Sequence, residues 1–147
     1  LEDIVLFKEK VPITKMPQII ADADLGVVPK RADSFGNEAY STKIMEFMSQ
    51  RLPTIISRTA IDTFYFSENE TVFCESGNVD QFAEAMIKVL TDESLRGQLI
   101  ENASAYVAKN DWNSRKQDYF EIVDGEGSIF SEPAIRANTP KLAEGNV

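Results

Sequence analysis

The chain has 147 residues, of which 43% are apolar and 27% are charged, as in one soluble globular domain with a sizeable core. Its net charge of −9 argues against a nucleic-acid partner, which would need a basic face. The absence of His excludes a Ser-His-Asp triad, a Cys-His dyad and nearly all His-based metal sites within the chain. The single Cys, Cys74, lies in an apolar run and is expected to be a buried, unreactive thiol.

Short apolar runs alternate with helical patterns along the first 124 residues. In chain order the predicted elements are a strand over 4–7, a helix over 17–23, a strand over 25–28, a helix over 41–50, a strand over 54–56, a short helix over 61–66, a strand over 71–74, and helices over 78–90, 93–109 and 112–123. Asn78 is the expected N-cap of its helix, and Gln81 the second member of a capping box. Unbroken apolar strands separated by helices indicate a parallel sheet covered on both faces. We therefore predict an α/β, Rossmann-like domain over residues 1–124.

Both ends of the chain have a different character. Breakers at Gly125, Gly127, Pro133 and Pro140 predict that residues 125–147 form a tail that packs on something else or stays mobile. The start lacks an initiator Met and the regions of a signal peptide, and it opens almost directly on a predicted strand. We expect a fragment or a processed piece. No apolar run approaches the roughly 20 residues that a membrane span needs.

The segment from Glu38 to Glu46 is the strongest candidate for a binding site. It follows the strand over 25–28, and ligands of open parallel sheets bind at the carboxyl ends of the strands. A helix that begins near Ser41 offers free N–H groups and a partial positive charge to a phosphate, with hydroxyls from Ser41 and Thr42 and a charge from Lys43. Lys30, Arg31 and Arg58 stand in neighbouring loops.

Two carboxylates flank this helix start. Glu46 lies one turn inside the helix among apolar residues, where an acid needs a partner. Glu38 lies in the loop before it. Taken singly, each acid is explained by the helix dipole or a salt bridge, each hydroxyl by capping and Lys43 by a surface position. The combination, at this place in the sheet, favours a site for an anion together with hydroxyl groups.

The same residues resemble a known family. Glu38, seven residues, Glu46, and then Pro53 before an apolar strand are similar to the donor-binding signature of GT-B glycosyltransferases of the GT4 type. The string from Gly36 to Glu46, the run Ser57-Arg58-Thr59, the run Glu75-Ser76-Gly77 before a helix, and Trp112 after a long helix extend the resemblance over roughly residues 1–124.

The resemblance implies the carboxyl-terminal, donor-binding half of a two-domain enzyme. Glu46 would accept hydrogen bonds from the ribose, Glu38 would contact the transferred sugar as the catalytic-site acid, and Ser41, Thr42 and Lys43 would hold the diphosphate. The donor-binding residues would also include Asn37, and Val11 in the loop that touches the base. The implied reaction is a retaining transfer from a nucleotide-diphospho-sugar to a hydroxyl of a carbohydrate or lipid-linked acceptor, in polysaccharide or glycoconjugate synthesis, without a metal or cofactor.

The resemblance also implies what this chain lacks. The acceptor-binding half and the first strands of the donor half, with their basic phosphate ligands, would precede Leu1, so we expect no turnover by this chain alone. We expect a cytoplasmic location, with any membrane attachment made through the missing half. Family members usually have Gly where Arg51 stands, to end the helix in a left-handed conformation, and Arg there costs about 1 kcal/mol or the turn differs.

Other functions stay open on the residues alone. A nucleotide-sugar epimerase on the same fold would use the same donor site. A non-catalytic α/β interaction module would leave the acids and Lys43 as surface groups. A phospho-receiver module does not fit, because the predicted strands end in Lys8, Pro29, Ser57 and Glu75 rather than in its acidic cluster, Asp and Lys.

Overall fold

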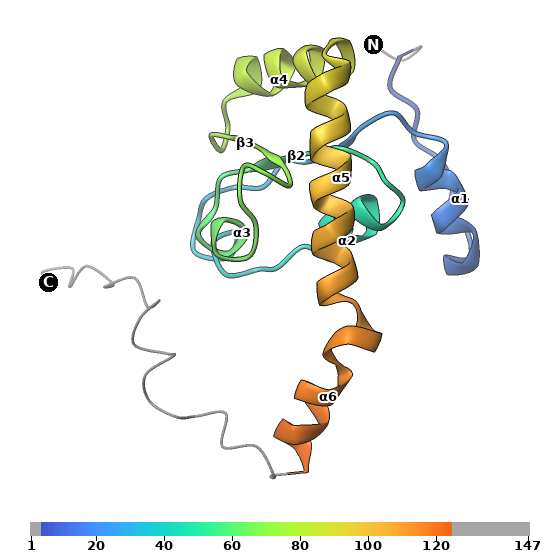
Figure 1. Cartoon of the computed structure of the whole chain (residues 1–147). Coiled ribbons are helices and arrows are strands. Elements are labelled where there is room, and N and C mark those ends of the chain that lie inside the picture. The colour runs from blue at the N-terminus through green and yellow to red at the C-terminus, as the bar shows by residue number, and fades with distance from the viewer. Residues whose placement is uncertain (1–3, 125–147) are drawn as a thin grey trace, which may run out of the picture. The chain divides into compact units, whose positions relative to one another are not determined.

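The computed structural model describes residues 4–124 (Figure 1). The chain divides into two compact units, Leu1–Lys109 and Asn110–Val147. The first unit contains the sheet, and the described part of the second contains one helix, α6 (Trp112–Val123). The tail predicted over 125–147 lies outside the described residues.

The first unit is built on a parallel sheet of three strands in the order β1 (Gly26–Val28), β2 (Thr54–Ser57) and β3 (Val72–Cys74) (Figure 1). Val27 pairs with Ile55, and Ile56 with Phe73. The strands predicted over 25–28, 54–56 and 71–74 are therefore confirmed, and so is the α/β class.

Helices account for most of the remaining described residues, and each predicted helix is present. After a 3-10 turn at Ile13–Lys15, the helices are α1 (Met16–Ala21), α2 (Thr42–Ser49), α3 (Ala60–Tyr65), α4 (Val79–Thr91), α5 (Glu93–Asn110) and α6. Asn78 caps α4 as predicted, because its Oδ1 accepts from the Gln81 N–H at 3.0 Å. The other half of the predicted capping box is wrong, since Gln81 Oε1 accepts from the Glu75 N–H instead. None of the described helices is long and apolar enough to cross a membrane.

Side chains of alternating strand residues point to opposite faces of the sheet and belong to two hydrophobic clusters, one on each face. One cluster contains Ile56 with residues of α2 and α5, and its buried members are Val28, Ile44, Met48, Ile56, Phe66, Phe73 and Ala103. The other joins the sheet to α4, and its buried members are Ile55, Cys74, Phe82, Ala85, Val89 and Leu99. Helix α5 contributes to both, through Ala103 and Leu99. The sheet is thus covered on both faces. Cys74 is buried in the second cluster, and this burial raises the pKa of its thiol.

The strand predicted over 4–7 is absent, and that prediction is wrong. Residues 5–7 have no regular secondary structure, and the side chains of Ile4, Val5, Leu6 and Phe7 are 52% to 96% exposed. An apolar run forms a strand only with a ladder partner and a covered face. Among the described residues, no strand pairs with this run.

Helix α2 ends in a left-handed residue, Arg51, with φ of 60°. The Arg51 N–H donates to the Met48 carbonyl at 3.0 Å, and the Leu52 N–H donates to the Phe47 carbonyl at 3.0 Å. These two bonds form a Schellman motif, which usually has Gly at the left-handed position. The turn expected from the sequence is therefore present, with its strain carried by Arg51.

Tyr40 packs against aromatic rings next to the hydrophobic cluster that contains Phe66. Its ring centroid is 5.0 Å from that of Tyr65 and 6.1 Å from that of Phe66. Burial, with smaller contributions from the charges of Tyr106, Tyr65 and Asp62, raises the pKa of the Tyr40 phenol to about 12. This packing holds the chain just before α2.

The left-handed Arg51 predicts a stabilising substitution. Arg51→Gly should raise the free energy of unfolding by about 1 kcal/mol, because Gly has no Cβ to strain in this region. Arg51→Ala removes the same charge and keeps the strain, so it is the matched control. Urea unfolding of the three proteins measures the effect, and equal stability of the Gly and Ala variants would contradict it.

The raised pKa of Tyr40 predicts a loss of stability in alkali. Below pH 10 the phenol is neutral in both states. Between pH 10 and about 12 it ionises in the unfolded chain and stays protonated in the folded one, so rising pH favours unfolding. Tyr40→Phe should flatten this decline and remove a phenol that titrates at about pH 12 in absorbance. Identical pH–stability slopes for the two proteins would show that burial does not shift this group.

Candidate functional site

A compact turn leads from β1 to α2. The Gly36 N–H donates to Asp33 Oδ1 at 2.8 Å, and the Ala39 N–H donates to the Phe35 carbonyl at 2.8 Å. Gly36 is buried, and a Cβ there would lie 1.7 Å from the Arg31 carbonyl oxygen. No side chain fits at Gly36, so the path of this turn depends on that glycine.

The same turn is fastened to the first turn of α3. Asn37 accepts from the Ala60 N–H through its Oδ1 at 3.0 Å and from the Ile61 N–H through its carbonyl at 3.0 Å. Lys30 Nζ lies 2.7 Å from Asp62 Oδ2 and donates to the Ala39 carbonyl at 2.8 Å. Asn37 and Ala39, the two neighbours of Glu38, are therefore both held in place.

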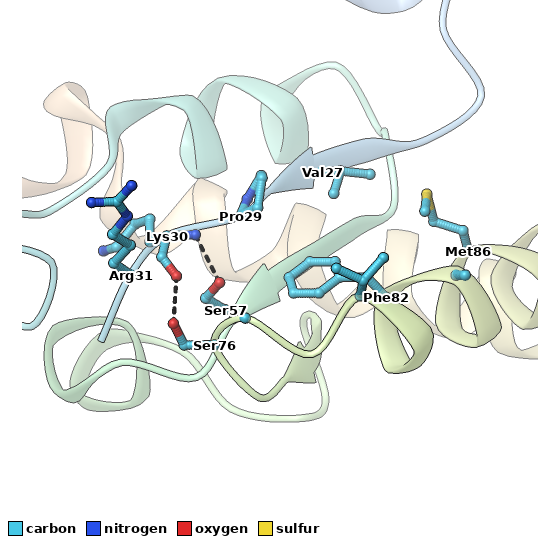
Figure 2. A pocket seen from close by; sticks show the side chains of 11 residues that line it. Val27, Pro29, Lys30, Arg31, Ser57, Ser76, Phe82 and Met86 are labelled. Atoms are coloured by element: carbon cyan, nitrogen blue, oxygen red, sulfur yellow. Dashed lines mark hydrogen bonds between the residues drawn. The ribbon is translucent and has the colours of Figure 1, made fainter. Parts of the chain in front are cut away.

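Two serines tie the start of this turn to the ends of the other strands. The Lys30 N–H donates to Ser57 Oγ at 2.7 Å, just after β1 and at the end of β2 (Figure 2). Ser76 Oγ, after β3, donates to the Lys30 carbonyl at 2.9 Å and accepts from the Ala32 N–H at 2.9 Å. The carboxyl ends of the three strands are thus bonded to one another.

Glu38 and Glu46 both present exposed carboxylates. Neither has an ion pair or a side-chain hydrogen bond to any residue that the structure describes. The expectation that Glu46 needs a partner in the protein is wrong: Ile44 and Met48 turn into the core, whereas Glu46 lies on the exposed side of α2. Both acids are open to a ligand.

The N-terminus of α2 lies between these acids and has no side-chain cap. Ser41 is the N-cap residue, with an extended backbone (φ −99°, ψ 108°), and its hydroxyl caps nothing. Thr59, Asn78 and Asp111 do cap α3, α4 and α6. Within residues 4–124, no acceptor binds the N–H groups of Thr42 and Lys43. Ser41, Thr42 and Lys43 therefore lie at the start of α2, where the helix was predicted to begin, and the N–H groups of Thr42 and Lys43 remain available as donors.

Two of the basic residues expected nearby are already occupied. The Lys30 side chain is 14% exposed and is paired with the buried Asp62. Arg58 pairs with Glu68 at 2.8 Å and Glu75 at 3.1 Å, and its guanidinium lies 4.8 Å from the Phe73 ring centroid. Lys43 is exposed and has no ion pair among the described residues. Of these cations, Lys43 is the one best placed at the start of α2.

Val11 is the one candidate residue that precedes β1 in the chain. It lies in the irregular stretch before the 3-10 turn and is 40% exposed. No hydrogen bond among the described residues joins it to α2. The contact of Val11 with a base stays a prediction.

A hollow of about 440 Å³ opens at the carboxyl ends of the strands, on the α4 side. Arg31 and Lys30 lie at one end and Phe82 and Met86 at the other (Figure 2). Its lining is mostly apolar and consists of Val27, Pro29, Lys30, Arg31, Ser57, Ser76, Gly77, Val79, Phe82, Ala83 and Met86. None of the residues assigned to the donor site lines it, but Lys30 and Arg31, the basic residues expected nearby, do. Ser57 and Ser76 link the strand ends through hydrogen bonds to Lys30, and these links were not predicted from the sequence. Their positions at or close after the ends of strands could have indicated it.

Comparison with known proteins identifies the family. The model of the family described as glycosyl transferases group 1 matches residues 1–106, which include the sheet and the whole Glu38–Glu46 segment. A search of curated proteins finds no match. Because the family model covers most of the chain, the chain belongs to the glycosyl transferases group 1 family.

Proposed function

We propose that this chain is a donor-binding domain of a glycosyltransferase and that it grips a nucleotide-diphospho-sugar at the start of α2. The observation that supports this most is the uncapped helix N-terminus between two exposed, unpaired carboxylates. The free N–H groups at the helix start can bind phosphate, and the carboxylates can accept hydrogen bonds from hydroxyl groups. A nucleotide sugar presents both kinds of group.

The diphosphate is assigned to the start of α2. The N–H groups of Thr42 and Lys43 point along the helix dipole toward an anion, and the hydroxyls of Ser41 and Thr42 add donors. The Lys43 ammonium adds a full charge. Because the chain carries a net charge of −9, attraction of an anion must come from local groups of this kind.

The hydroxyl groups of the donor are assigned to the two acids. Glu46 accepts from the ribose hydroxyls and Glu38 from the transferred sugar, since a carboxylate accepts two such bonds. Asn37 lies beside Glu38, but its Oδ1 is occupied by the Ala60 N–H, so its amide NH₂ is the group left for a ligand. Val11 would meet the base through its backbone.

The reaction we propose breaks the bond between the anomeric carbon and the diphosphate and joins that carbon to an acceptor hydroxyl on the same face. The acceptor is a carbohydrate or a lipid-linked group, held by another part of the protein. The donor-side contribution is to stabilise charge on the leaving diphosphate and to orient the sugar. The family resemblance alone supports the remaining parts of the proposal. These are retention of the anomeric configuration, independence of metal, a role in polysaccharide or glycoconjugate synthesis, and a cytoplasmic location.

The two acids predict separable binding defects. Glu46→Ala should weaken binding of a nucleoside diphosphate and of its sugar conjugate alike, by about 10-fold or more, because a lost hydrogen bond to a charged group is worth about 1.5–3 kcal/mol. Glu38→Ala should weaken only the sugar conjugate. Thermal-shift and calorimetric titrations with UDP, GDP and their sugars measure both effects.

Glu84→Ala is the matched control, because Glu84 is an exposed acid of α4. It should bind like the wild-type chain. If Glu46→Ala also binds like wild type, the ribose assignment is wrong. If the wild-type chain shows no stabilisation by any of these nucleotides, the chain is an interaction module instead.

A further inference from the structure

The ion pair between Lys30 and Asp62 differs from the others among the described residues. Asp62 is fully buried, with 0% of its side chain exposed, whereas both partners of each other pair are at least 30% exposed. Asp62 Oδ2 also accepts from the Thr59 hydroxyl at 2.7 Å. Asp62 Oδ1 is buried and has no hydrogen-bond partner within the described residues.

This pair is poorly explained by stability alone. Moving two charges out of water costs more than their attraction returns unless every lone pair is satisfied, and apolar replacements of such pairs are often neutral or stabilising. Asp62 Oδ1 leaves one acceptor unsatisfied, which adds to that cost. Buried ion pairs of this kind are more readily kept in a protein where they hold nearby groups in a specific geometry.

The geometry that it fixes is the backbone beside Glu38. Lys30 Nζ bridges Asp62 Oδ2 and the Ala39 carbonyl, so it joins the buried carboxylate of α3 to the peptide group that follows Glu38 and Ala39. The first turn of α3 holds Asn37 on the other side of Glu38. Ser41, the N-cap of α2, comes two residues after Ala39.

We propose that Lys30 and Asp62 are positioning residues of the donor site, which hold Glu38 and the start of α2 in the geometry that binds the donor. This inference rests on the proposed function. Lys30 acts here through the Ala39 carbonyl and not as a phosphate ligand, because its ammonium is already bound on two sides. The gain is preorganisation: a fixed loop loses less conformational freedom when the ligand binds.

The test replaces Lys30 and Asp62 by apolar residues in the full 147-residue chain. Lys30→Met/Asp62→Leu should leave the midpoint of urea unfolding unchanged or raised, and should weaken binding of UDP- or GDP-sugars at least 10-fold. Adding Glu38→Ala to this background should cost less affinity than it does in wild type, because Glu38 is no longer held in place. A purely structural pair would leave the effect of Glu38→Ala the same in both backgrounds, and that result overturns the inference.

A second variant and a ligand-free measurement guard against misfolding. Asp62→Asn is nearly isosteric and should lower the ¹⁵N order parameters of residues 38–42 and weaken sugar-nucleotide binding at least threefold. Unchanged order parameters and affinity overturn the inference. The exposed pair Arg115–Asp118, changed in the same way to Met and Leu, should alter neither quantity.

The outcomes separate the two proposals. If the wild-type chain binds no nucleotide sugar, both the proposed function and the positioning role fail. If the wild-type chain binds and the Lys30/Asp62 variants bind equally well, only the positioning role fails.

Discussion

Parallel pairing of β1, β2 and β3 brings the carboxyl ends of three strands to one edge, and the rest of the site depends on that alignment. Three loops that are distant in sequence meet there, and Ser76 reaches Lys30 across 46 positions of the chain. The bonds from Ser57 and Ser76 to Lys30 fix where the β1–α2 turn begins. The bonds from α3 to Asn37 and from the Lys30 ammonium to the Ala39 carbonyl fix where it ends, just before α2.

In the proposed function, a fixed turn allows an acidic protein to hold an anion. The chain repels phosphate as a whole, so attraction must come from the two open N–H groups and the adjacent Lys43. Of the other nearby cations, Lys30 and Arg58 are bound to carboxylates and stabilise the frame of the site, whereas Arg31 lines the hollow beside α4. Glu38 and Glu46 can then accept from hydroxyls on either side. In the proposed function, frame and ligand contacts are made by separate residues, except that Asn37 serves both.

Much of this fold could be predicted because the signals are local. The strand over 54–56 is buried on both faces and reads as an unbroken apolar run, and α6 begins and ends where periodicity placed it. The run over 4–7 has the same apolar character, but a strand also needs a partner, which no local pattern reports. The family resemblance left two possibilities for Arg51, a strained left-handed residue or a different turn, and the structure shows the first.

The site was predictable only in part. The residues of α2 share one helix, so their grouping followed from the sequence. The exposure of Glu46 depends on which side of α2 faces the core, and apolar neighbours alone did not settle it. The pairing of Lys30 with Asp62 joins residues 32 positions apart, so it depends on how α3 packs beside the β1–α2 turn. From the sequence, Lys30 was noted only as a basic residue in a loop that neighbours the candidate site, because no local pattern links it to Asp62.

The central claim is that the free N–H groups at the start of α2 bind the diphosphate. Amide ¹H–¹⁵N spectra of the chain, titrated with UDP and GDP, test it directly. The account predicts that at least one of these nucleotides causes saturable shifts that are largest at Thr42 and Lys43, with little change at Val79 and Asp80 in the capped first turn of α4. Shifts that are absent at Thr42 and Lys43, or largest around Ser76 and Gly77 in the hollow beside α4, would contradict it.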